Sequence, residues 1–247
     1  MKQIHFYAVI IGTEILNGRR ADKHFSFLKS ALAERGYSLF ASFIIKDDPE
    51  LIEQTYRLIM ADPHSVMFSF GGIGSTPDDL TRAIAAKVFT AKELARHQQF
   101  ERDIIERFGN EAYPHRIFMS ELPVGSSLLK NPVNNMSGFY LEQRFFFVPG
   151  FPEMAHTMIH EALERFYPAN RMLYRYTLYA KTSENTLIDL MKEIPEYIEL
   201  SSLPVFRDNI PNVELSVAGY DETESRKWFL TFVKYLDDHN IEYTETS

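Results

Sequence analysis

The residues best suited to chemistry form one glycine-rich segment, Gly71-Gly72-Ile73-Gly74-Ser75-Thr76-Pro77-Asp78-Asp79. Three glycines directly after a predicted buried strand allow unusual backbone angles and let a ligand approach the main chain closely. The helix predicted from Leu80 to Val88 would add unpaired amide groups and a positive dipole end, which favour an anion. The segment therefore predicts a site for a phosphate, a nucleotide or another anion.

A purely structural interpretation of the same residues is a helix cap. Thr76-Pro77-Asp78-Asp79 fits a capping box, with Thr76 as the cap, Pro77 in the first turn and Asp79 folding back. Capping explains these residues but not the three glycines before Ser75. The segment matches neither G-x-G-x-x-G nor a Walker A loop, because Pro77 occupies the last glycine position and Gly-Lys-Ser/Thr is absent.

Other polar residues give weaker indications. Glu153, His156 and His160 have the spacing of one helix face, but H-E-x-x-H is absent, so we favour a surface or boundary pair over a metal site. Arg82 and Arg116 either contact phosphate or are solvated.

The elements around the glycine segment alternate between strand and helix. Apolar runs at 4–11, 39–45 and 65–70 predict strands, and helical spacing at 22–35 and after Asp48 predicts the helices between them. We expect an α/β fold with a doubly wound, mainly parallel sheet in three layers. Such a sheet places the glycine segment at the carboxyl end of a central strand, where ligands bind. Further helices are predicted at 80–88, 91–108 and 153–166, and strands at 126–130, 139–141 and 145–148.

The order of elements changes near Pro168. A strand at 173–180, a helix at 185–191, strands at 198–206 and 213–218, and a helix at 224–237 no longer alternate regularly. We therefore predict two domains, 1–168 and a small α+β domain at 169–247.

Composition narrows the function classes. The 247 residues include no cysteine, which excludes disulfides, thiolate metal sites and cysteine nucleophiles. The formal net charge of −8 argues against a nucleic-acid partner. No signal peptide or membrane-spanning run is evident, so we expect a cytoplasmic protein without a membrane partner.

The segment GGIGSTPDDLT resembles the glycine loop of the MoaB/Mog molybdopterin-binding domain, and more closely that of the amino-terminal domain of competence/damage-inducible protein A (CinA). Further segments resemble the same family in the same order: Gly12-Thr13-Glu14-Ile15-Leu16-Asn17-Gly18, Lys46-Asp47-Asp48, His115 to Pro123, Asn131-Pro132-Val133, Gly138-Phe139 and Val148 to Met154. The resemblance spans residues 4 to about 166. The amidohydrolase domain of long CinA proteins is not expected in this chain, so we do not transfer that activity.

The resemblance implies a pocket and its residues. Relatives adenylylate molybdopterin, or cleave the pyrophosphate of dinucleotides such as ADP-ribose with a metal ion. Asp79 would be the catalytic and metal-binding acid, supported by Asp47 and Glu14, and all-oxygen ligation favours Mg²⁺ or Mn²⁺, with Co²⁺ or Ni²⁺ left open. A homo-oligomer, dimer or trimer, is also implied. The phosphate and ligand contacts would come from Gly71, Gly72, Gly74, Ser75, Thr76, Gly12, Thr13, Glu14, Arg116, Pro149 and Gly150.

Departures from the family pattern leave the activity open. CinA proteins have proline at the position of Ser75, and a small pair where Met136-Ser137 stands. Molybdopterin adenylyltransferases have arginine at the position of Asp78, and a serine-containing segment where this chain has Phe151-Pro152. We therefore favour a dinucleotide-type ligand over molybdopterin. A metal-dependent pyrophosphatase, a non-catalytic nucleotide or pterin module, and an oligomer with a vestigial pocket remain the alternatives.

Overall fold

Strand β1 (His5–Ile11) is an inner strand of the six-stranded sheet, the largest of the three sheets in the computed structural model, which describes residues 4–169, 172–207 and 210–246. Its side chains from Phe6 to Ile11 are all buried, as expected for a strand covered by helices on both faces. β2 (Leu39–Ile45) and β3 (Ser65–Phe70) run parallel to β1 on either side of it, and β8 (Phe145–Val148) runs parallel to β3. The predicted α/β fold with a central parallel sheet is confirmed.

One edge of this sheet is antiparallel. β7 (Gly138–Leu141) pairs with β8, and β6 (Ser127–Leu129) pairs with β7, so the strand order is β2-β1-β3-β8-β7-β6. Glu142 and Gln143 have φ angles of 54° and 56°, which suit the tight turn of a hairpin between β7 and β8. The short turn leaves no room for a crossover helix, so the two strands must run in opposite directions.

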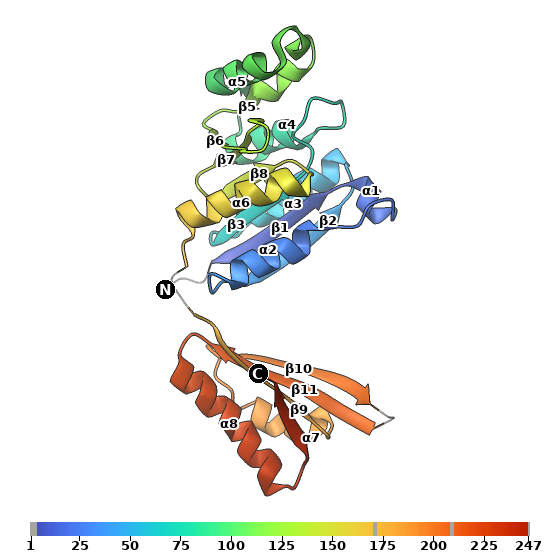
Figure 1. Ribbon diagram of the computed structural model, residues 1–247, viewed down its shortest axis with the longest axis vertical. Coiled ribbons are helices and arrows are strands. Elements are labelled where there is room, and N and C mark those ends of the chain that lie inside the picture. Colours follow the sequence, from blue (N-terminus) through green and yellow to red (C-terminus); the bar gives the residue numbers. More distant parts are fainter. Residues whose placement is uncertain (1–3, 170–171, 208–209, 247) are drawn as a thin grey trace. The chain divides into compact units, whose positions relative to one another are not determined.

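Helices cover both faces of the six-stranded sheet and make three layers (Figure 1). α2 (His24–Ala33) and α6 (Pro152–Phe166) pack on the face that carries Phe6, Ala8 and Ile10. α3 (Pro49–Ala61) and α4 (Thr81–Ala85) pack on the other face with Val9 and Ile11. The predicted helix after Asp48 is confirmed, and Asp48 is its cap, because its side chain accepts a hydrogen bond from the Leu51 amide at 2.9 Å.

The predicted helix at 91–108 is wrong in its first third. A π-helix, η1 (Ala86–Thr90), ends at Ala91, whose φ of 51° is incompatible with helix continuation. Strand β4 (Leu94–Arg96) then pairs with β5 (Glu121–Pro123) before α5 (Gln98–Phe108) begins. This pairing joins residues far apart in the sequence, so local periodicity does not reveal it. The remaining short helices are α1 (Thr13–Leu16), η2 (Gly109–Ala112) and η3 (Arg116–Ser120).

The chain divides into two compact units, Met1–Ala169 and Asn170–Ser247. The predicted boundary, between 168 and 169, is one residue earlier and lies beside residues 170–171, which are outside the described part. The second unit has its own antiparallel sheet in the order β10-β11-β9-β12, with its helices on one face around Leu215 and Phe232. Its elements are β9 (Tyr174–Ala180), α7 (Glu184–Met191), β10 (Glu199–Arg207), β11 (Ile210–Gly219), α8 (Glu222–Asp238) and β12 (Tyr243–Thr246). The sequence pattern missed β12, an edge strand that is largely exposed and polar.

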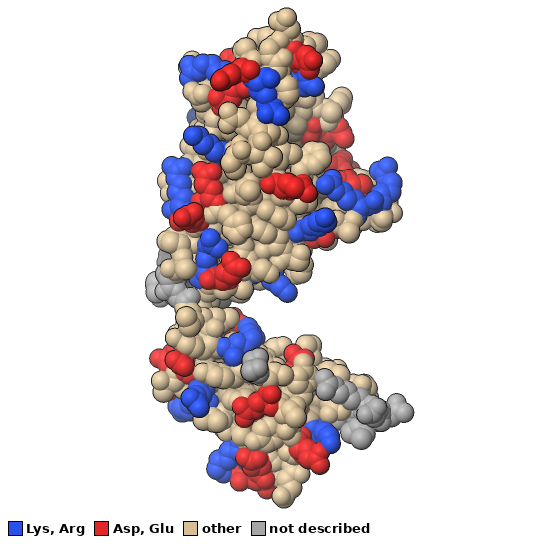
Figure 2. Space-filling model, viewed as in Figure 1, with Lys and Arg blue, Asp and Glu red and all other residues tan. Residues whose placement is uncertain are grey.

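Charges of both signs are interspersed over the face shown in Figure 2. In the described part of the chain, no helix is both long enough and apolar enough to span a membrane.

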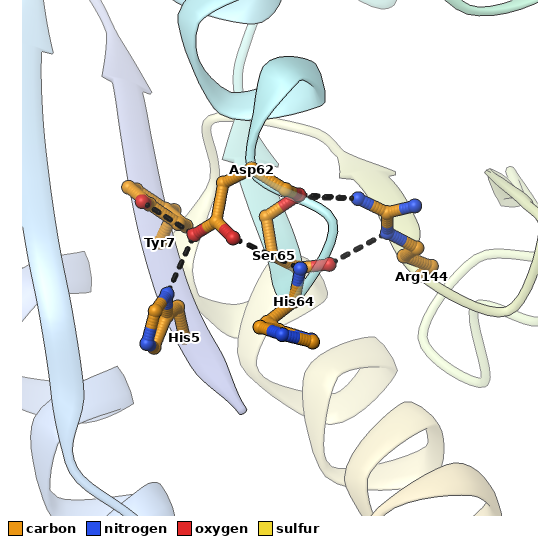
Figure 3. A network of polar contacts seen from close by, with 6 residues as sticks. All are labelled: His5, Tyr7, Asp62, His64, Ser65 and Arg144. Atoms are coloured by element: carbon orange, nitrogen blue, oxygen red, sulfur yellow. Dashed lines mark hydrogen bonds and ion pairs between the residues drawn. The ribbon is translucent and has the colours of Figure 1, made fainter. Parts of the chain in front are cut away.

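A polar network joins the amino-terminal ends of the central strands (Figure 3). The Asp62 carboxylate accepts hydrogen bonds from Tyr7 Oη at 2.9 Å and the His64 amide at 2.9 Å, and it lies 2.6 Å from His5 Nδ1. Arg144, just before β8, donates to the backbone carbonyls of Asp62 and Ser65, at 2.7 Å each. Burial works against the charge of Asp62, but the hydrogen bonds outweigh it and lower its pKa.

We expect Asp62→Asn to destabilise the larger unit by about 1–3 kcal/mol near neutral pH, because the hydrogen bonds to a charged acceptor are lost. A lowered folded-state pKa adds stability above the ordinary carboxyl pKa, and this stability is lost as the pH falls through the lowered value. The difference between wild type and variant should therefore shrink on acidification. Thermal unfolding followed by circular dichroism at several pH values measures it.

Two controls accompany this measurement. Trp228, the single tryptophan, packs in the separate core of the second unit, so its fluorescence transition should not change. Glu34→Gln alters an exposed acid of the larger unit and should have little effect. A difference between wild type and Asp62→Asn that stays constant with pH would contradict the assigned role of this carboxylate.

Candidate functional site

The carboxyl ends of β1 and β3 are adjacent, since Ile10 is paired with Phe70 in the parallel ladder. The strand that follows β1 in the chain, β2, lies next to β1 at one edge of the sheet. The strands of this sheet that follow β3, namely β6, β7 and β8, all lie on the opposite side of β3. Such a reversal of strand order separates the two following loops and is where open α/β sheets bind ligands. Gly12, Thr13 and Glu14 follow β1, and the glycine segment follows β3, so the two predicted halves of the pocket do meet at this edge.

Gly71 and Gly72 have backbone conformations that favour glycine, with φ of 101° and 70°. A Cβ atom on Gly71 would lie 2.6 Å from the Ile11 carbonyl oxygen, and one on Gly72 would collide with the side chain of Thr81. The Gly71 amide donates to the Val148 carbonyl at 2.9 Å, while Thr81 Oγ1 donates to the Gly71 carbonyl at 2.9 Å. The ends of β1, β3 and β8 therefore fix the path of the glycine segment.

Four consecutive amides of this segment are unused. Among the residues that the structure describes, none accepts a hydrogen bond from the backbone N–H of Gly72, Ile73, Gly74 or Ser75. All four residues are partly exposed. Successive free amides in a turn attract an anion.

The helix cap predicted at Thr76 is wrong. α4 begins only at Thr81, and the Thr81 amide already donates to the Gly72 carbonyl at 3.0 Å. Thr76 instead closes a turn inside the loop, where its amide and its hydroxyl donate to Asp79 Oδ2 at 2.8 and 2.6 Å. The first amide of the short α4 is therefore already used, and we look to the loop itself for free amides.

The three predicted metal-binding acids are not brought together as one group. Asp47 accepts the amide and the hydroxyl of Thr13, both at 2.8 Å, and so closes the turn after β1. Glu14 lies 4.0 Å from Arg20 Nη1, and Asp79 holds the Thr76 turn. Within residues 4–169, 172–207 and 210–246, no three His, Asp or Glu side chains are arranged to hold a metal ion. Asp79, Asp47 and Glu14 therefore do not form such a group, and their role as metal-binding acids stays a prediction.

Arg82 has a role that sequence patterns did not identify. It is buried, and its guanidinium donates to the Gly74 carbonyl at 2.7 Å, to the Glu121 carbonyl at 3.1 Å and to the Phe118 carbonyl. Burial lowers its pKa, and the nearby acids Asp79 and Glu121 oppose this effect. Arg82 therefore connects the glycine segment to η3 and β5 through hydrogen bonds. Its guanidinium is neither solvated nor free to bind phosphate. An arginine one residue after a threonine gives no local signal of such a role.

The remaining predicted residues divide into two groups. Gly150 belongs to the site, because a Cβ atom on it would lie 3.6 Å from Gly71 Cα, and Pro149 precedes it directly after β8. Arg116 donates to the Glu111 carboxylate at 2.9 Å, and its guanidinium lies 4.6 Å from the centre of the Phe108 ring. These contacts of Arg116 do not involve the glycine segment.

We expect Gly72→Ala to lower the stability of the larger unit by about 2 kcal/mol beyond the cost of backbone strain alone, because its Cβ would displace Thr81. Gly18→Ala is the matched control, since Gly18 has φ of 78° and open space around its Cβ position. The control should lose only about 1 kcal/mol. Thermal unfolding measures both variants, and equal losses would contradict the close approach at Gly72.

A family model described as "Probable molybdopterin binding domain" matches residues 7–169. A protein of Caldivirga maquilingensis is 27% identical over 235 residues, covering 89% of this chain and 90% of that protein. A CinA-like protein of Acaryochloris marina is 31% identical over 160 residues, covering 62% of this chain but only 38% of that protein. The crystal structure of CinA from Thermoplasma acidophilum is similar with a TM-score of 0.59 and 25% identity, covering 66% of this chain and 97% of that one.

These matches cover the unit that carries the glycine segment, and they confirm the resemblance seen in its motifs. The chain belongs to the MoaB/Mog family of probable molybdopterin-binding domains, with CinA-like proteins among its relatives.

Proposed function

We propose that the larger unit binds a phosphate-bearing nucleotide, with the phosphate on the backbone of the glycine segment. The observation that carries this proposal is the row of four unused amides from Gly72 to Ser75 at the edge of the sheet where the strand order reverses. Amides held in place by the packing of three strand ends need little reorganisation when they bind an anion. The chain's membership of a molybdopterin-binding domain family supports a phosphate-bearing ligand independently.

The proposed ligand is a dinucleotide such as ADP-ribose. Asp78 is exposed beside the cradle, at a position where the sequence comparison with adenylyltransferases leads us to expect arginine. The Asp78 carboxylate repels a ligand whose negative charge is concentrated on one phosphate group, as in free phosphate and in molybdopterin. ADP-ribose spreads its charge over the two phosphates of its pyrophosphate, which are flanked by a neutral adenosine and a neutral second ribose. Molybdopterin is the alternative ligand, and its binding without turnover would make the protein a pterin module.

Asp79 acts on the ligand through the loop in this proposal. Its carboxylate holds the Thr76 turn, and Gly74 has no side chain to obstruct it, since a Cβ atom there would lie 2.6 Å from Asp79 Oδ2. The described acids do not fit a preformed metal site, so we derive no hydrolytic step through a metal. Metal-dependent pyrophosphatase activity remains the alternative function, to be decided by the experiment below. A cytoplasmic location and a dimer or trimer also stay predictions.

Calorimetric titration of wild type, Asp79→Asn and Asp79→Ala with ADP-ribose, AMP and molybdopterin tests the proposal. We expect wild type to bind ADP-ribose, and Asp79→Asn to stay within about threefold of it, because an amide oxygen can still accept from Thr76. Asp79→Ala releases the turn and should lose about tenfold in affinity, equivalent to about 1.4 kcal/mol. The Asn variant thus serves as the matched control for the Ala variant.

The same samples decide between binding and catalysis. Incubation with Mg²⁺, Mn²⁺, Co²⁺ or Ni²⁺, followed by chromatography, would reveal release of AMP from ADP-ribose. If wild type releases AMP from ADP-ribose and Asp79→Asn does not, Asp79 has a catalytic role and not only a positioning role. If wild type binds none of the three ligands, the proposed function is wrong and a structural oligomer is favoured.

A further inference from the structure

Two histidines lie side by side in the helical layer that α2 and α6 form on one face of the large sheet. His24 is the first residue of α2, His156 lies near the beginning of α6, and their ring centroids are 5.4 Å apart. The His24 ring stacks on Phe70 of β3 with the centroids 4.4 Å apart, and the His156 ring stacks on Phe27 of α2 with the centroids 3.7 Å apart. The pair therefore joins α2, α6 and the end of β3.

Each histidine of the pair has one buried ring nitrogen without a hydrogen-bond partner among the residues that the structure describes. These atoms are Nδ1 of His24 and Nε2 of His156. The other nitrogen of His24, Nε2, lies 3.4 Å from the Gly150 carbonyl oxygen. A buried polar atom without a partner lowers stability, and an apolar group of the same shape avoids this cost. A phenylalanine ring could stack in the same way, so packing alone does not account for the two nitrogens.

A positive charge makes the burial of the pair more unfavourable. A protonated imidazole carries a hydrogen on both of its nitrogens. The two buried atoms then become donors that have no acceptor within the described part of the chain. Burial is the largest effect on both rings, and it lowers the pKa of His24 and lowers that of His156 to about 4. Both rings are therefore neutral near pH 7.

Four charged or titratable side chains act on the pair: Asp22, Glu153, Arg20 and His160. The two acids favour protonation, whereas Arg20 opposes it at His24 and His160 opposes it at His156. A charge on His24 also opposes a charge on His156. The acids do not compensate for burial, since the pKa of each ring stays below its ordinary value.

His24 connects the pair to the candidate site. Phe70, on which its ring stacks, directly precedes Gly71, and Gly150, which faces its Nε2 atom, lies against Gly71. We propose that His24 and His156 form an acid-responsive contact, in which protonation separates α2 from α6 and loosens the turn at Gly150. The strand ends around Gly71 are then held less firmly in mildly acidic solution. The contact acts on the fold itself, so the proposal goes beyond phosphate binding and its test needs no ligand.

Thermal unfolding of wild type and His156→Phe at about pH 7.5 and about pH 5 tests the proposal. Because the folded-state pKa lies below the ordinary value of 6.5, the unfolded chain binds more protons, and stability is lost as the pH falls from about 6.5 toward about 4. We expect the melting temperature of wild type to fall by about 4 °C more than that of His156→Phe. At the higher pH the variant should be at least as stable as wild type, because it lacks the unpartnered nitrogen.

His160→Phe is the matched control. His160 lies one turn after His156 on α6 and also contacts Phe27, with the ring centroids 5.0 Å apart, but it is exposed. Its replacement should therefore leave the pH dependence of the melting temperature close to that of wild type.

Hydrogen exchange at the same two pH values locates the structural change. After correction for the intrinsic exchange rate, acid should reduce the protection of wild-type amides about tenfold in α2 and α6. Protection in α3, on the opposite face of the sheet, should change less. His156→Phe should keep the protection of α2 and α6 at both pH values.

Three results would overturn the proposal. The first is a melting temperature that depends on pH equally in wild type and His156→Phe. The second is a loss of protection that is no larger in α2 and α6 than in α3, since the pair would then change stability without separating the helices. The third comes from an NMR titration of wild type, which does not depend on the folding of any variant. A His156 ring that titrates near the ordinary value of 6.5 would contradict the buried neutral state.

Discussion

The close approach of three strand ends is the constraint on which the site depends. Gly71 donates to Val148 of β8, its missing Cβ leaves room for the carbonyl of Ile11 in β1, and its Cα lies against Gly150. A side chain at this point would separate the strands, and the neighbouring Gly72 would in turn displace Thr81 from α4. The backbone after β3 is therefore held in a conformation in which four amides have no hydrogen-bond partner within the described part of the chain. Binding capacity at this edge is a consequence of how the strands pack.

This arrangement would account for the proposed anion site in a protein of net charge −8. The amides are neutral, and the buried Arg82, which contacts the loop at Gly74, donates its hydrogen bonds to backbone carbonyls. Asp79 and Asp47, which the motifs suggested as metal-binding acids, instead hold the turns after β3 and β1. In this structure, these two acids stabilise the conformation of the loops that form the candidate pocket. In the proposed function, the contacts with the ligand phosphate come from the backbone amides of the glycine segment.

The sequence predicts the parts of the fold that local patterns encode. The apolar runs of β1, β2 and β3 and the cap at Asp48 are visible in the residues themselves, and the motifs around Gly71 identify the family. What it does not predict depends on distant partners. β4 forms because it pairs with β5, Arg82 is buried because η3 and Gly74 offer carbonyls, and α4 starts at Thr81 because Asp79 takes Thr76. A capping pattern and a loop turn use the same residues, so only the three-dimensional contacts distinguish them.

Backbone amide shifts during a ligand titration test the central claim most directly. A ¹H–¹⁵N NMR titration with ADP-ribose observes each amide separately, including those of Gly72, Ile73, Gly74 and Ser75. If the glycine segment holds the phosphate, these four resonances shift together and saturate with one dissociation constant, whereas the already bonded Gly71 amide changes less. Binding that leaves the four resonances in place, while amides elsewhere shift, would contradict the account.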